Sequence, residues 1–515
     1  MTAIIENILR PQSWPGSIWV LLLSTLIPLL VQVFWRPSLP ANAPKWWKTG
    51  DWPVLGTLRF YRARADWYLD ALRNSPTGSF SFYVGKKQVI GLSGEEGRKF
   101  FFESRDLNLG AGFAELLTGQ PSQLAEMDDF NVFFARNLGV MFRREHLSKL
   151  LGTLTHDTRQ AFEALAAAPP PASRSGDAEG WKVMAPFESL YELVYQLTMR
   201  TVGANDIADD PALLRHTLDI FEGFEASGSV AKVFFPWLPT PKHVMRLYNG
   251  ARLAMVFQKI IDGRKSTGKR GEDALQVLID GGAGIKDIIG FVIGALYAGQ
   301  LNSGVNAAWL HIFLVQNPDW HARVRAEVDA AIAKHRASPS QSAADVLGSL
   351  SIEAWEADFR LVDLCLRETI RLCLPGTSFR KNTSGRDLPI GGTGEVVPRG
   401  AYAAYLVDDV FMDPQIYAEP RRFDPGRYFE ERAEDKKVPH AYLGWGAGRH
   451  PCLGMRFARL EMAFITAYFV AMFDFELSDR DGNPVTEALP LSSRNLHSAK
   501  KPDRPVYLRY RPRVN

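Results

Sequence analysis

Cysteine is scarce in this sequence. The chain has 515 residues and only three cysteines, Cys365, Cys373 and Cys452. Three thiols are too few for a disulfide-stabilised secreted protein, so we expect a reducing compartment. An excess of one charge sign is also absent, because 60 basic side chains stand against 57 acidic ones. This balance predicts no nucleic-acid-binding surface, and we expect no nucleic-acid partner.

Long uncharged runs are absent except near the N-terminus. The run Ile18–Trp35 has no charged residue and is about the minimum length for a helix that crosses ~30 Å of hydrocarbon. The charges that follow are all basic, which favours a cytoplasmic position for the rest of the chain: Arg36, Lys45 and Lys48. We predict a membrane anchor over residues 1–36 and a proline-rich linker over residues 37–50. A cleaved signal peptide is the main alternative, although no small-residue cleavage site follows the run, and a buried core helix is the other.

Helical periodicity dominates the rest of the chain, and we find no internal repeat. Two short strand candidates, Phe80–Ser93 and Glu395–Val407, each contain a turn signal and each predict a small β-hairpin. The fold class we expect is therefore mainly α with small β-sheets. Nothing beyond the linker marks a second independent domain. Segments with helical periodicity include 286–316, 360–374 and 453–473.

Cys452 lies in a glycine-rich, basic loop that reads "LGWGAGRHPCLG", just before an apolar-periodic segment. Gly446, Gly448 and Gly454 permit backbone conformations that side chains oppose, so a flat group can approach the loop. The N–H groups at the start of the predicted helix and the guanidinium of Arg449 favour a thiolate at Cys452. The sulfur is therefore expected to be an anion.

A lone thiolate narrows the kinds of site that Cys452 can serve. A tetrahedral zinc site usually takes four protein ligands, whereas an iron already held by a porphyrin needs one axial bond from the protein. A cysteine nucleophile is a second interpretation, but His450 is too close in sequence to be an obvious general base and no other partner is evident. A small core residue is the third, and we keep that interpretation for Cys365 and Cys373.

Three motifs in this order resemble those of the cytochrome P450 family. The segment "WGAGRHPCLG" is similar to the family's haem-binding signature, with Trp445 where phenylalanine is usual. The segment "ETIR" (368–371) resembles its E-x-x-R motif, and "FDPGRY" (423–428) its F-x-P-x-R-aromatic motif. The resemblance covers nearly the whole chain. It implies the cytochrome P450 fold with an N-terminal transmembrane helix and a single haem-thiolate catalytic domain over residues 51–515.

The resemblance implies roles for individual residues. Cys452 is the implied iron ligand of haem b, and Arg380 the implied propionate contact. The other implied haem-binding residues all belong to the cysteine loop: Trp445, Gly446, Gly448, Arg449, His450 and Gly454. Glu368, Arg371 and Arg427 are implied to form a buried ion network that holds this loop, unlike an ordinary surface pair worth ~0.3 kcal/mol. A second propionate contact stays open among Arg143, Arg144 and Lys149.

The segment "AGQLNSG" (298–304) departs from the family pattern of an acid followed by an alcohol. Ala298 and Gly299 keep the small residues that leave room for dioxygen and substrate, but Leu301 replaces the acid and Asn302 the threonine. An asparagine amide can hydrogen-bond a ligand or a water, whereas leucine cannot relay a proton. Ser303 offers a hydroxyl, about 100° around the helix from Asn302. Ala298, Gly299, Asn302 and Ser303 are the catalytic residues we predict, and the proton route is open.

These departures resemble the branch that contains sterol 14-demethylases, cholesterol 7-alpha-hydroxylase and prostacyclin synthase, with the texture of fungal microsomal members. The resemblance implies a monooxygenase that uses dioxygen and electrons from NADPH-cytochrome P450 reductase to oxidise a lipophilic small molecule such as a terpenoid, a steroid or another specialised metabolite. It also implies a single-pass protein of the endoplasmic reticulum membrane with its catalytic domain on the cytoplasmic side. Basic residues that could meet the reductase are Lys436, Lys437, Arg456 and Arg459.

Two other classes of function stay open on the sequence alone. The first is a haem-thiolate isomerase or dehydratase, since asparagine at position 302 also occurs in that kind of enzyme and such an enzyme needs neither NADPH nor dioxygen. The second is a haem-binding protein without catalytic activity. Dependence on NADPH and dioxygen separates the monooxygenase from the isomerase, and carbon monoxide binding to thiolate-ligated iron separates both from a protein without activity.

Overall fold

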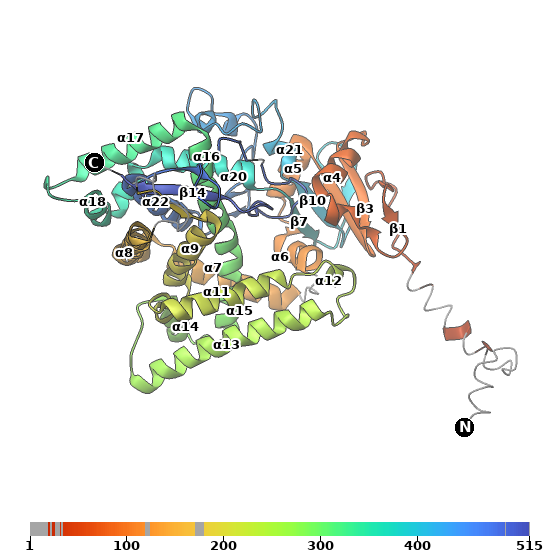
Figure 1. The fold of residues 1–515 in the computed structure, drawn as a ribbon. Helices are drawn as coiled ribbons and strands as arrows, with labels where there is room; N and C mark the ends of the chain where they lie inside the picture. The colour runs from red at the N-terminus through yellow and green to blue at the C-terminus, as the bar shows by residue number, and fades with distance from the viewer. Residues whose placement is uncertain are drawn as a thin grey trace, which may run out of the picture.

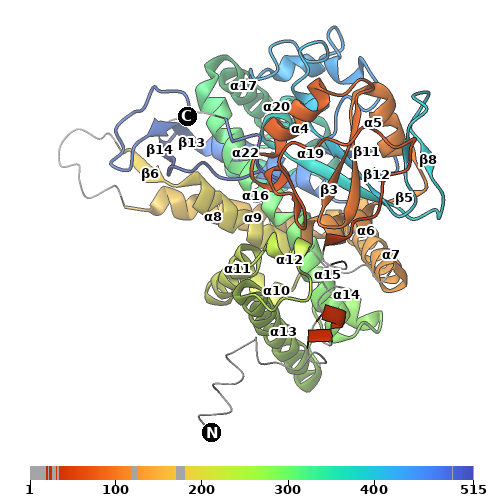
Figure 2. The same cartoon turned by 90° about the vertical axis from the view of Figure 1, so that its right-hand side faces the viewer.

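The computed structural model describes residues 19–20, 23–25, 31, 34–118, 124–169, 180–489 and 491–513. These residues form a mainly helical protein with small sheets, and most of the helices lie to one side of the largest sheet (Figures 1 and 2). Most of the predicted membrane anchor falls outside them, so the anchor stays a prediction. In the described part of the chain, one helical run is long and apolar enough to cross a membrane, Ile285–Gln316, and it belongs to the helical core.

The largest sheet has seven strands in the order β1-β2-β3-β4-β10-β7-β5. Its first predicted hairpin is confirmed, because β3 pairs antiparallel with β4. The second is wrong: β10 pairs with β4 and β7, while β9 (Val396–Val397) pairs with β8 (Leu388–Pro389). The seven strands are β1 (Asp51–Trp52), β2 (Gly56–Thr57), β3 (Ser79–Val84), β4 (Lys87–Leu92), β5 (Leu107–Asn108), β7 (Thr377–Asn382) and β10 (Tyr402–Leu406).

The helical core is built around α16 (Gln300–Gln316), which packs against α9, α20, α22 and α17. Both α16 and α22 are buried on nearly all sides, so their sequences are apolar almost throughout rather than on one stripe. Pro318 occupies the first turn of α17, where its missing N–H costs no hydrogen bond. The helices around α16 are α8 (Arg144–Ala167), α9 (Pro186–Val202), α17 (Pro318–His335), α20 (Arg360–Cys373) and α22 (Met455–Met472).

An outer layer of helices surrounds α15 (Ile285–Ala298), the helix that precedes α16. In this layer α13 lies along the edge of the molecule (Figure 1). Asp210 caps α11 and Thr240 caps α13, each with a side-chain oxygen that accepts a backbone N–H. This layer consists of α7 (Leu124–Met141), α10 (Asn205–Ala208), α11 (Pro211–Ala226), α12 (Ala231–Phe234), α13 (Pro241–Thr267) and α14 (Ala274–Asp280).

The remaining elements are short or lie near the large sheet. They include α4 (Arg64–Arg73), α5 (Gly94–Glu103), α6 (Leu109–Phe113), the turn of π-helix η2 (Ala114–Thr118), α18 (Ala343–Ser349), α19 (Ile352–Ala357) and α21 (Asp408–Phe411), and a small sheet of β13 (Phe473–Ser478), β14 (Tyr507–Pro512) and β6 (Lys182–Met184).

The predicted linker, residues 37–50, lies against the large sheet. The N–H of Trp47 donates to the carbonyl of Ser81 on β3 at 2.8 Å, and the hydroxyl of Ser81 donates to the carbonyl of Pro44 at 2.6 Å. Arg36 pairs with Asp51 at 2.7 Å across the ends of the linker. These contacts attach the segment before residue 51 to the sheet, while the domain boundaries at 36 and 50 stay a prediction.

Candidate active site

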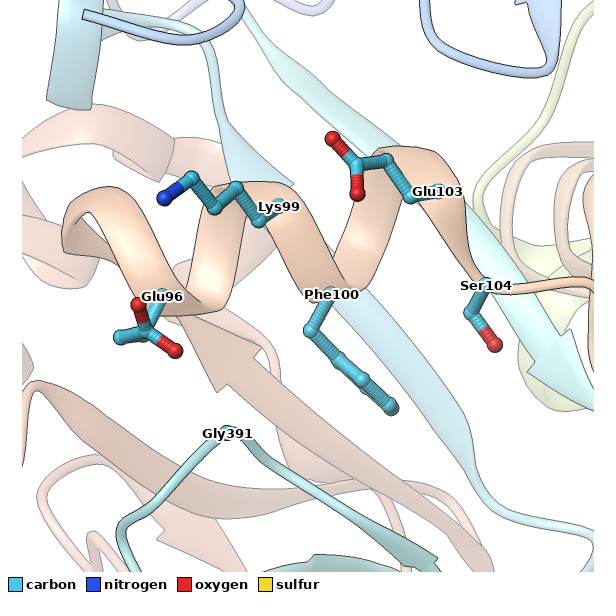
Figure 3. A pocket seen from close by; sticks show the side chains of 6 residues that line it. All are labelled: Glu96, Lys99, Phe100, Glu103, Ser104 and Gly391. Atoms are coloured by element: carbon cyan, nitrogen blue, oxygen red, sulfur yellow. The ribbon is translucent and has the colours of Figure 1, made fainter.

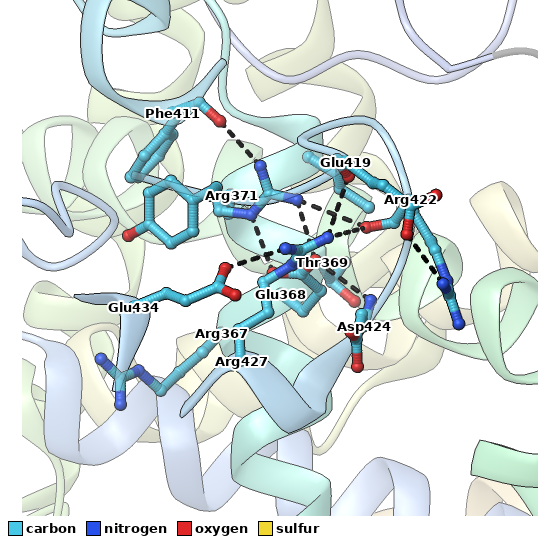
Figure 4. Close-up of polar contacts among 12 residues, drawn as sticks. Arg367, Glu368, Thr369, Arg371, Phe411, Glu419, Arg422, Asp424, Arg427 and Glu434 are labelled. Carbon is cyan, nitrogen blue, oxygen red and sulfur yellow. Dashed lines mark hydrogen bonds and ion pairs between the residues drawn. The ribbon is translucent and has the colours of Figure 1, made fainter. Parts of the chain in front are cut away.

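The structure brings Glu368, Arg371 and Arg427 together in a fully buried network (Figure 4). Arg371 donates through Nε and Nη2 to the two Glu368 oxygens, at 2.8 Å each, and Arg427 Nε donates to Glu368 at 2.9 Å. Two further members escaped the sequence analysis: Tyr428 OH donates to Glu368 at 2.9 Å, and Arg427 Nη1 donates to Glu434 at 2.9 Å. Tyr428 is the aromatic of the "FDPGRY" motif, whereas no pattern in the sequence points to Glu434.

Aromatic rings join this network to the cysteine loop. The guanidinium of Arg367 on α20 lies over the rings of Tyr428 and Tyr442, at 4.4 and 4.7 Å from their centroids. Tyr442 OH donates to the Arg367 carbonyl at 3.0 Å, and Leu443 begins the loop directly after it. The buried charges therefore fix the residues from which the loop starts.

The cysteine loop folds back on itself as a two-residue hairpin. β11 (Gly446–Ala447) pairs antiparallel with β12 (His450–Pro451), and the Cys452 N–H donates to the Trp445 carbonyl at 2.7 Å. Gly446 has φ +69°, and a Cβ there would lie 2.3 Å from the carbonyl oxygen of His450. Only glycine fits this position.

The loop also closes against α5. Gly448 has φ +59°, and a Cβ there would lie 2.2 Å from the Phe102 carbonyl oxygen. The same carbonyl accepts the Arg449 N–H at 3.1 Å. The position of Gly454 is less crowded, since a Cβ there would lie 3.4 Å from the ring of Phe142. The close contacts at Gly446 and Gly448 are with the chain's own backbone, so the predicted approach of a flat group to the three glycines stays a prediction.

The thiol of Cys452 keeps an exposed face, whereas Cys365 and Cys373 are buried in the core, as predicted. Helix α22 begins at Met455, so the cysteine precedes the helix. Burial raises the pKa of Cys452, and the N–H groups of Gly454 and Met455 lower it by less. The expectation that the protein alone makes this sulfur an anion is therefore wrong, because burial outweighs the helix terminus. A coordinated metal ion removes that proton outright.

Arg380 on β7 is a buried cation without an acid partner among the residues that the structure describes. Its side chain is 2% exposed, and Nε and Nη1 have no hydrogen-bond partner among the described residues. The guanidinium lies over the Phe101 ring at 4.9 Å. Burial and the charge of Arg449 lower the pKa of Arg380 to about 10, and burial, Arg380 and Arg449 together lower the pKa of His450. Arg380, Arg449 and His450 therefore form a cluster, called here the basic cluster, whose members repel one another and which has no anion from the described part of the chain.

The cluster and the loop fit the two ends of a haem. Its propionates are anions, and the unpaired N–H groups of Arg380 are the donors that an anion would complete. A single thiol is the kind of ligand that an iron already held by a porphyrin would take from the protein. Trp445, half-buried, packs against the main apolar cluster beside the loop. Of the open candidates for a further propionate contact, Arg144 is taken by Glu353 and Glu356, at 3.0 and 3.3 Å.

The predicted catalytic segment interrupts a helix. The expected single helix over 286–316 is two helices, α15 and α16, with Gly299 between them at φ −95° and ψ −67°. Asn302 Nδ2 donates to the carbonyl of Ala298 at 2.9 Å, across this break, and both residues have exposed side chains. Leu301, at the position of the expected acid, packs against the apolar cluster around α15. We call residues 298–303 the Gly299 turn.

The basic residues proposed for a partner are largely paired already. Arg456 binds Glu356 at 3.1 Å and Arg459 binds Asp363 at 2.5 Å. Lys437 donates to the Ile416 carbonyl at 2.8 Å, although its side chain is exposed. Two of the four predicted positive charges are thus already paired with neighbouring carboxylates.

A surface hollow of about 360 Å³ lies elsewhere on α5 (Figure 3). None of the residues that line it was predicted for the site, and its acidic and basic side chains are exposed, so we assign it no catalytic role: Glu96, Lys99, Phe100, Glu103, Ser104 and Gly391.

Comparison with known proteins places the chain in a family. A family model described as Cytochrome P450 matches residues 149–499. The chain is 32% identical over 475 residues to the cytochrome P450 monooxygenase AacuE of Aspergillus aculeatus. The aligned residues cover 90% of this chain and 92% of that protein. Sterol 14-demethylase of Arabidopsis thaliana is more distant, 29% identical over 286 residues, or 53% of this chain and 54% of that protein.

A solved structure agrees with these matches. Retinoic acid-bound cyanobacterial CYP120A1 superposes on the chain with a TM-score of 0.68 at 21% identity, over 92% of this chain and all of that one. At that identity the likeness establishes the mainly helical fold with small sheets. The chain belongs to the cytochrome P450 family and is a cytochrome P450 monooxygenase.

Proposed function

We propose that this monooxygenase holds haem b through Cys452 and oxidises a lipophilic small molecule, with electrons from NADPH-cytochrome P450 reductase. The observation that carries the proposal is the pairing of one accessible thiol with a basic cluster that has no anion of its own. Haem bound there supplies the activation of dioxygen that lets one oxygen atom enter a C–H bond. The protein binds the haem, orients the substrate and shields both from solvent.

The residues around the thiol then divide the binding task. Cys452 would give the sulfur ligand to the iron, and Arg380 and His450, with Arg449, would compensate the propionate charges. The positive-φ glycines, Gly446 and Gly448, let the loop backbone lie close to the ring. The ion network holds the loop from below, so Glu368, Arg371 and Arg427 act on structure rather than on the substrate.

The Gly299 turn serves the substrate side in this proposal. Ala298 has a methyl side chain and an exposed face, which leaves volume for dioxygen and part of the substrate. The amide of Asn302 uses one N–H to bridge the helix break and keeps a second N–H and its oxygen for a ligand or water. The apolar residues of α15 behind the turn favour a lipophilic substrate. The likeness to a fungal monooxygenase supports a specialised metabolite, including terpenoids and steroids, as the substrate class.

Membrane attachment is part of the proposal: a single-pass protein of the endoplasmic reticulum membrane, with the catalytic domain on the cytoplasmic side. The described apolar residues of the N-terminal run are exposed, and so is an apolar patch on α13 and the loop before it. We call the second group the α13 patch: Trp237, Val244, Leu247, Tyr248 and Met255. Exposed apolar area of this kind is stable in contact with lipid. Flotation with phospholipid vesicles tests it, since a chain lacking residues 1–36 should float weakly and lose that binding when Trp237 and Leu247 become serine.

The reductase would meet the side of the molecule that carries the cysteine loop. Lys436 and Lys437 are exposed, while Arg456 and Arg459 are held in ion pairs. Charge pairing at an exposed surface weakens with salt. Reduction of the haem by the reductase should therefore become slower as the salt concentration is raised. It should also be slower when both lysines are replaced by glutamine.

The deciding experiment compares two cysteine variants. The reduced carbon monoxide difference spectrum of wild type and of Cys365→Ala should show the red-shifted Soret band typical of thiolate-ligated haem, whereas Cys452→Ala should not. A normal band in Cys452→Ala overturns the assignment of the ligand. Product formation that continues without NADPH and dioxygen would instead favour isomerase chemistry.

A further inference from the structure

A second buried arginine has no anion beside it. Arg64 is the first residue of α4 and is 3% exposed, and its Nε and Nη1 have no hydrogen-bond partner among the described residues. In that part of the chain the only other arginine with two buried, unpartnered nitrogens is Arg380, which the proposed function supplies with a haem propionate. Burying a charge without a counter-ion costs much free energy, so Arg64 indicates a place for a second anion.

Aromatic rings stabilise the guanidinium of Arg64 without satisfying its N–H groups. The central carbon lies 4.9 Å from the centroid of the Phe60 ring, and 5.6 Å from the centroids of Tyr61 and Phe379. A ring face attracts the charge, but an N–H group still needs an acceptor for a hydrogen bond. Burial lowers the pKa of Arg64 to about 10, so the group stays a cation at neutral pH. The rings therefore replace only part of the lost hydration.

Arg64 and Arg380 lie on opposite faces of the large sheet. Phe379, whose ring contacts Arg64, directly precedes Arg380 on β7, and successive side chains of a strand point to opposite faces. Phe60 and Phe379 belong to one apolar cluster, whereas Phe101, which lies under Arg380, belongs to another. The anion that Arg380 binds therefore does not serve Arg64.

The face of β7 that carries Arg64 has a second polar group without a partner. Thr377 precedes Phe379 by two residues, so it shares that face, and its buried hydroxyl oxygen has no partner within the described ranges. The other cation on this face, Lys381, is already paired with Glu115 at 2.7 Å. The unused donors on this side of the strand are therefore those of Arg64 and Thr377.

A molecule can pass from this face to the basic cluster around the edge of the sheet. Among the described strands, β5 pairs only with Lys381 and Asn382 of β7, so no strand lies beside Thr377 and Phe379 on that edge. Thr377 precedes Arg380 by three residues, which corresponds to about 10 Å along a strand. A small molecule is long enough to extend from Arg64 past this edge toward the proposed haem.

A loop near the C-terminus brings His497 to the start of β7. A Cβ on Gly376, which directly precedes Thr377, would lie 2.7 Å from the carbonyl oxygen of His497, so the two backbones are in contact. Asn495 of the same loop exchanges two hydrogen bonds with α4, at 3.1 and 2.8 Å. Burial and then the charge of Arg64 lower the pKa of His497 to about 4. The imidazole is therefore neutral at physiological pH and does not act as a second cation.

We propose that Arg64 and Thr377 bind the carboxylate of an acidic, lipophilic substrate. The proposal rests on the proposed function and narrows its substrate class to lipophilic carboxylic acids. Two N–H groups and one hydroxyl supply three donors, and the oxygens of a carboxylate accept from all of them. The rings of Phe60 and Phe379 provide the apolar contact for the carbon atoms next to the acid group. We call these residues the carboxylate subsite.

Dodecanoate and dodecanamide test the proposal in the haem-loaded protein, because the two probes share a chain and differ in charge. Equilibrium dialysis with isotope-labelled probes gives both dissociation constants. We expect wild type to bind dodecanoate at least about tenfold more tightly than dodecanamide, because charge-assisted hydrogen bonds act only on the acid. Arg64→Gln should weaken the binding of dodecanoate by about tenfold to one hundredfold and leave that of dodecanamide within about twofold.

Thr377→Val removes one neutral donor and keeps the shape of the side chain. It should weaken the binding of dodecanoate by about twofold to tenfold. Arg62→Gln is the matched control, since it removes the same charge from an exposed position at the end of α3 (Arg59–Arg62) and should change neither constant. If Arg64→Gln does not fold, Arg64→Lys, which keeps the charge, and Thr377→Val decide the matter by a smaller preference for the acid.

The outcomes separate the two proposals. A wild-type protein without the thiolate-type carbon monoxide band defeats the proposed function, whereas dialysis measures the preference for the acid independently of that band. A wild-type protein with the band, but with equal affinity for the two probes or with the preference retained in Arg64→Gln, overturns the carboxylate subsite alone.

Discussion

The ion network and the Gly299 turn satisfy their polar groups in opposite ways. In the network every Glu368 oxygen accepts at least two hydrogen bonds, from Arg371, Arg427, Tyr428 and the Asp424 N–H. Around the turn, the oxygens of Gln300 and Asn306 and both oxygens of Glu461 are buried without partners among the described residues. The ion network is called here the closed region, because both oxygens of Glu368 are fully used as acceptors. The surroundings of the Gly299 turn are called the open region, because buried oxygens there could still accept hydrogen bonds.

This difference indicates which region has a structural role and which region binds ligands. A network whose hydrogen-bonding groups are paired fixes the cysteine loop but has no free group that could bind a substrate. Unpartnered buried oxygens lower stability, and they persist where water, protons or a ligand use them. The basic cluster shares this property, since Nε and Nη1 of Arg380 also lack partners within the described ranges. Substitutions in the network should therefore act on folding, and substitutions in the other regions on binding and coupling.

The largest effect is expected from Glu368→Gln. It leaves two buried guanidinium groups without their shared carboxylate and should lower the free energy of unfolding by about 3–5 kcal/mol. Urea unfolding measures it. Glu419→Gln is the matched control, because Glu419 and Arg422 have the same three-residue spacing but are 69% and 64% exposed, and it should cost below about 1 kcal/mol. Equal losses in the two variants would contradict a special role for the network.

Next comes Arg380→Gln, which removes a charged donor from the basic cluster and should leave folding intact. Loss of charge-assisted hydrogen bonds of about 1.5–3 kcal/mol weakens haem binding by about tenfold to one hundredfold. Titration of the haem-free protein with haem gives the affinity, with Arg386→Gln, 74% exposed, as control. Unchanged affinity in Arg380→Gln would remove this residue from haem binding.

Gly446→Ala should have a smaller effect on stability. A positive φ costs a non-glycine residue about 1–2 kcal/mol, and the contact with the His450 carbonyl adds strain in the loop that carries the thiol. The melting temperature and the haem-to-protein ratio should both fall. Gly392→Ala is a suitable control, since a Cβ there meets nothing within 4 Å. A variant with wild-type haem content would show that the loop tolerates the shift.

Asn302→Ala should change stability least, by at most about 1 kcal/mol, because it removes one exposed hydrogen bond across the helix break. Its effect should fall on the share of NADPH electrons that reaches product. Product and peroxide measured per NADPH consumed report that share. An unchanged ratio would remove Asn302 from the handling of oxygen and leave the Gly299 turn to Ser303.

Much of the closed region could be predicted from the sequence. Glu368 and Arg371 lie on one helix face, and Arg427 stands in a recognisable motif, so their meeting follows from spacing and resemblance. Glu434 carried no such signal, because it reaches Arg427 only through the fold of the chain after β10. The first hairpin was predictable from a turn between two strand-forming runs. The second failed because β10 finds its partners in β4 and β7, which are distant in sequence.

The open region was less predictable. The helix break at Gly299 competes with an apolar pattern that continues through it, so the sequence predicts one helix. The burial of Glu461 depends on how α16 and α22 pack together, and a lone glutamate in an apolar helix gives no sign of it. The pKa of Cys452 was predicted in the wrong direction because burial cannot be read from the loop's own residues.

The central claim is that the sulfur of Cys452 binds the haem iron. Resonance Raman spectroscopy of the ferric protein, produced with natural and with sulfur-34 cysteine, tests it most directly. The account predicts an iron–sulfur stretching band that moves to lower frequency with the heavier isotope and is retained when Cys365 and Cys373 are both replaced by alanine. A spectrum without any band that responds to the sulfur isotope would contradict it.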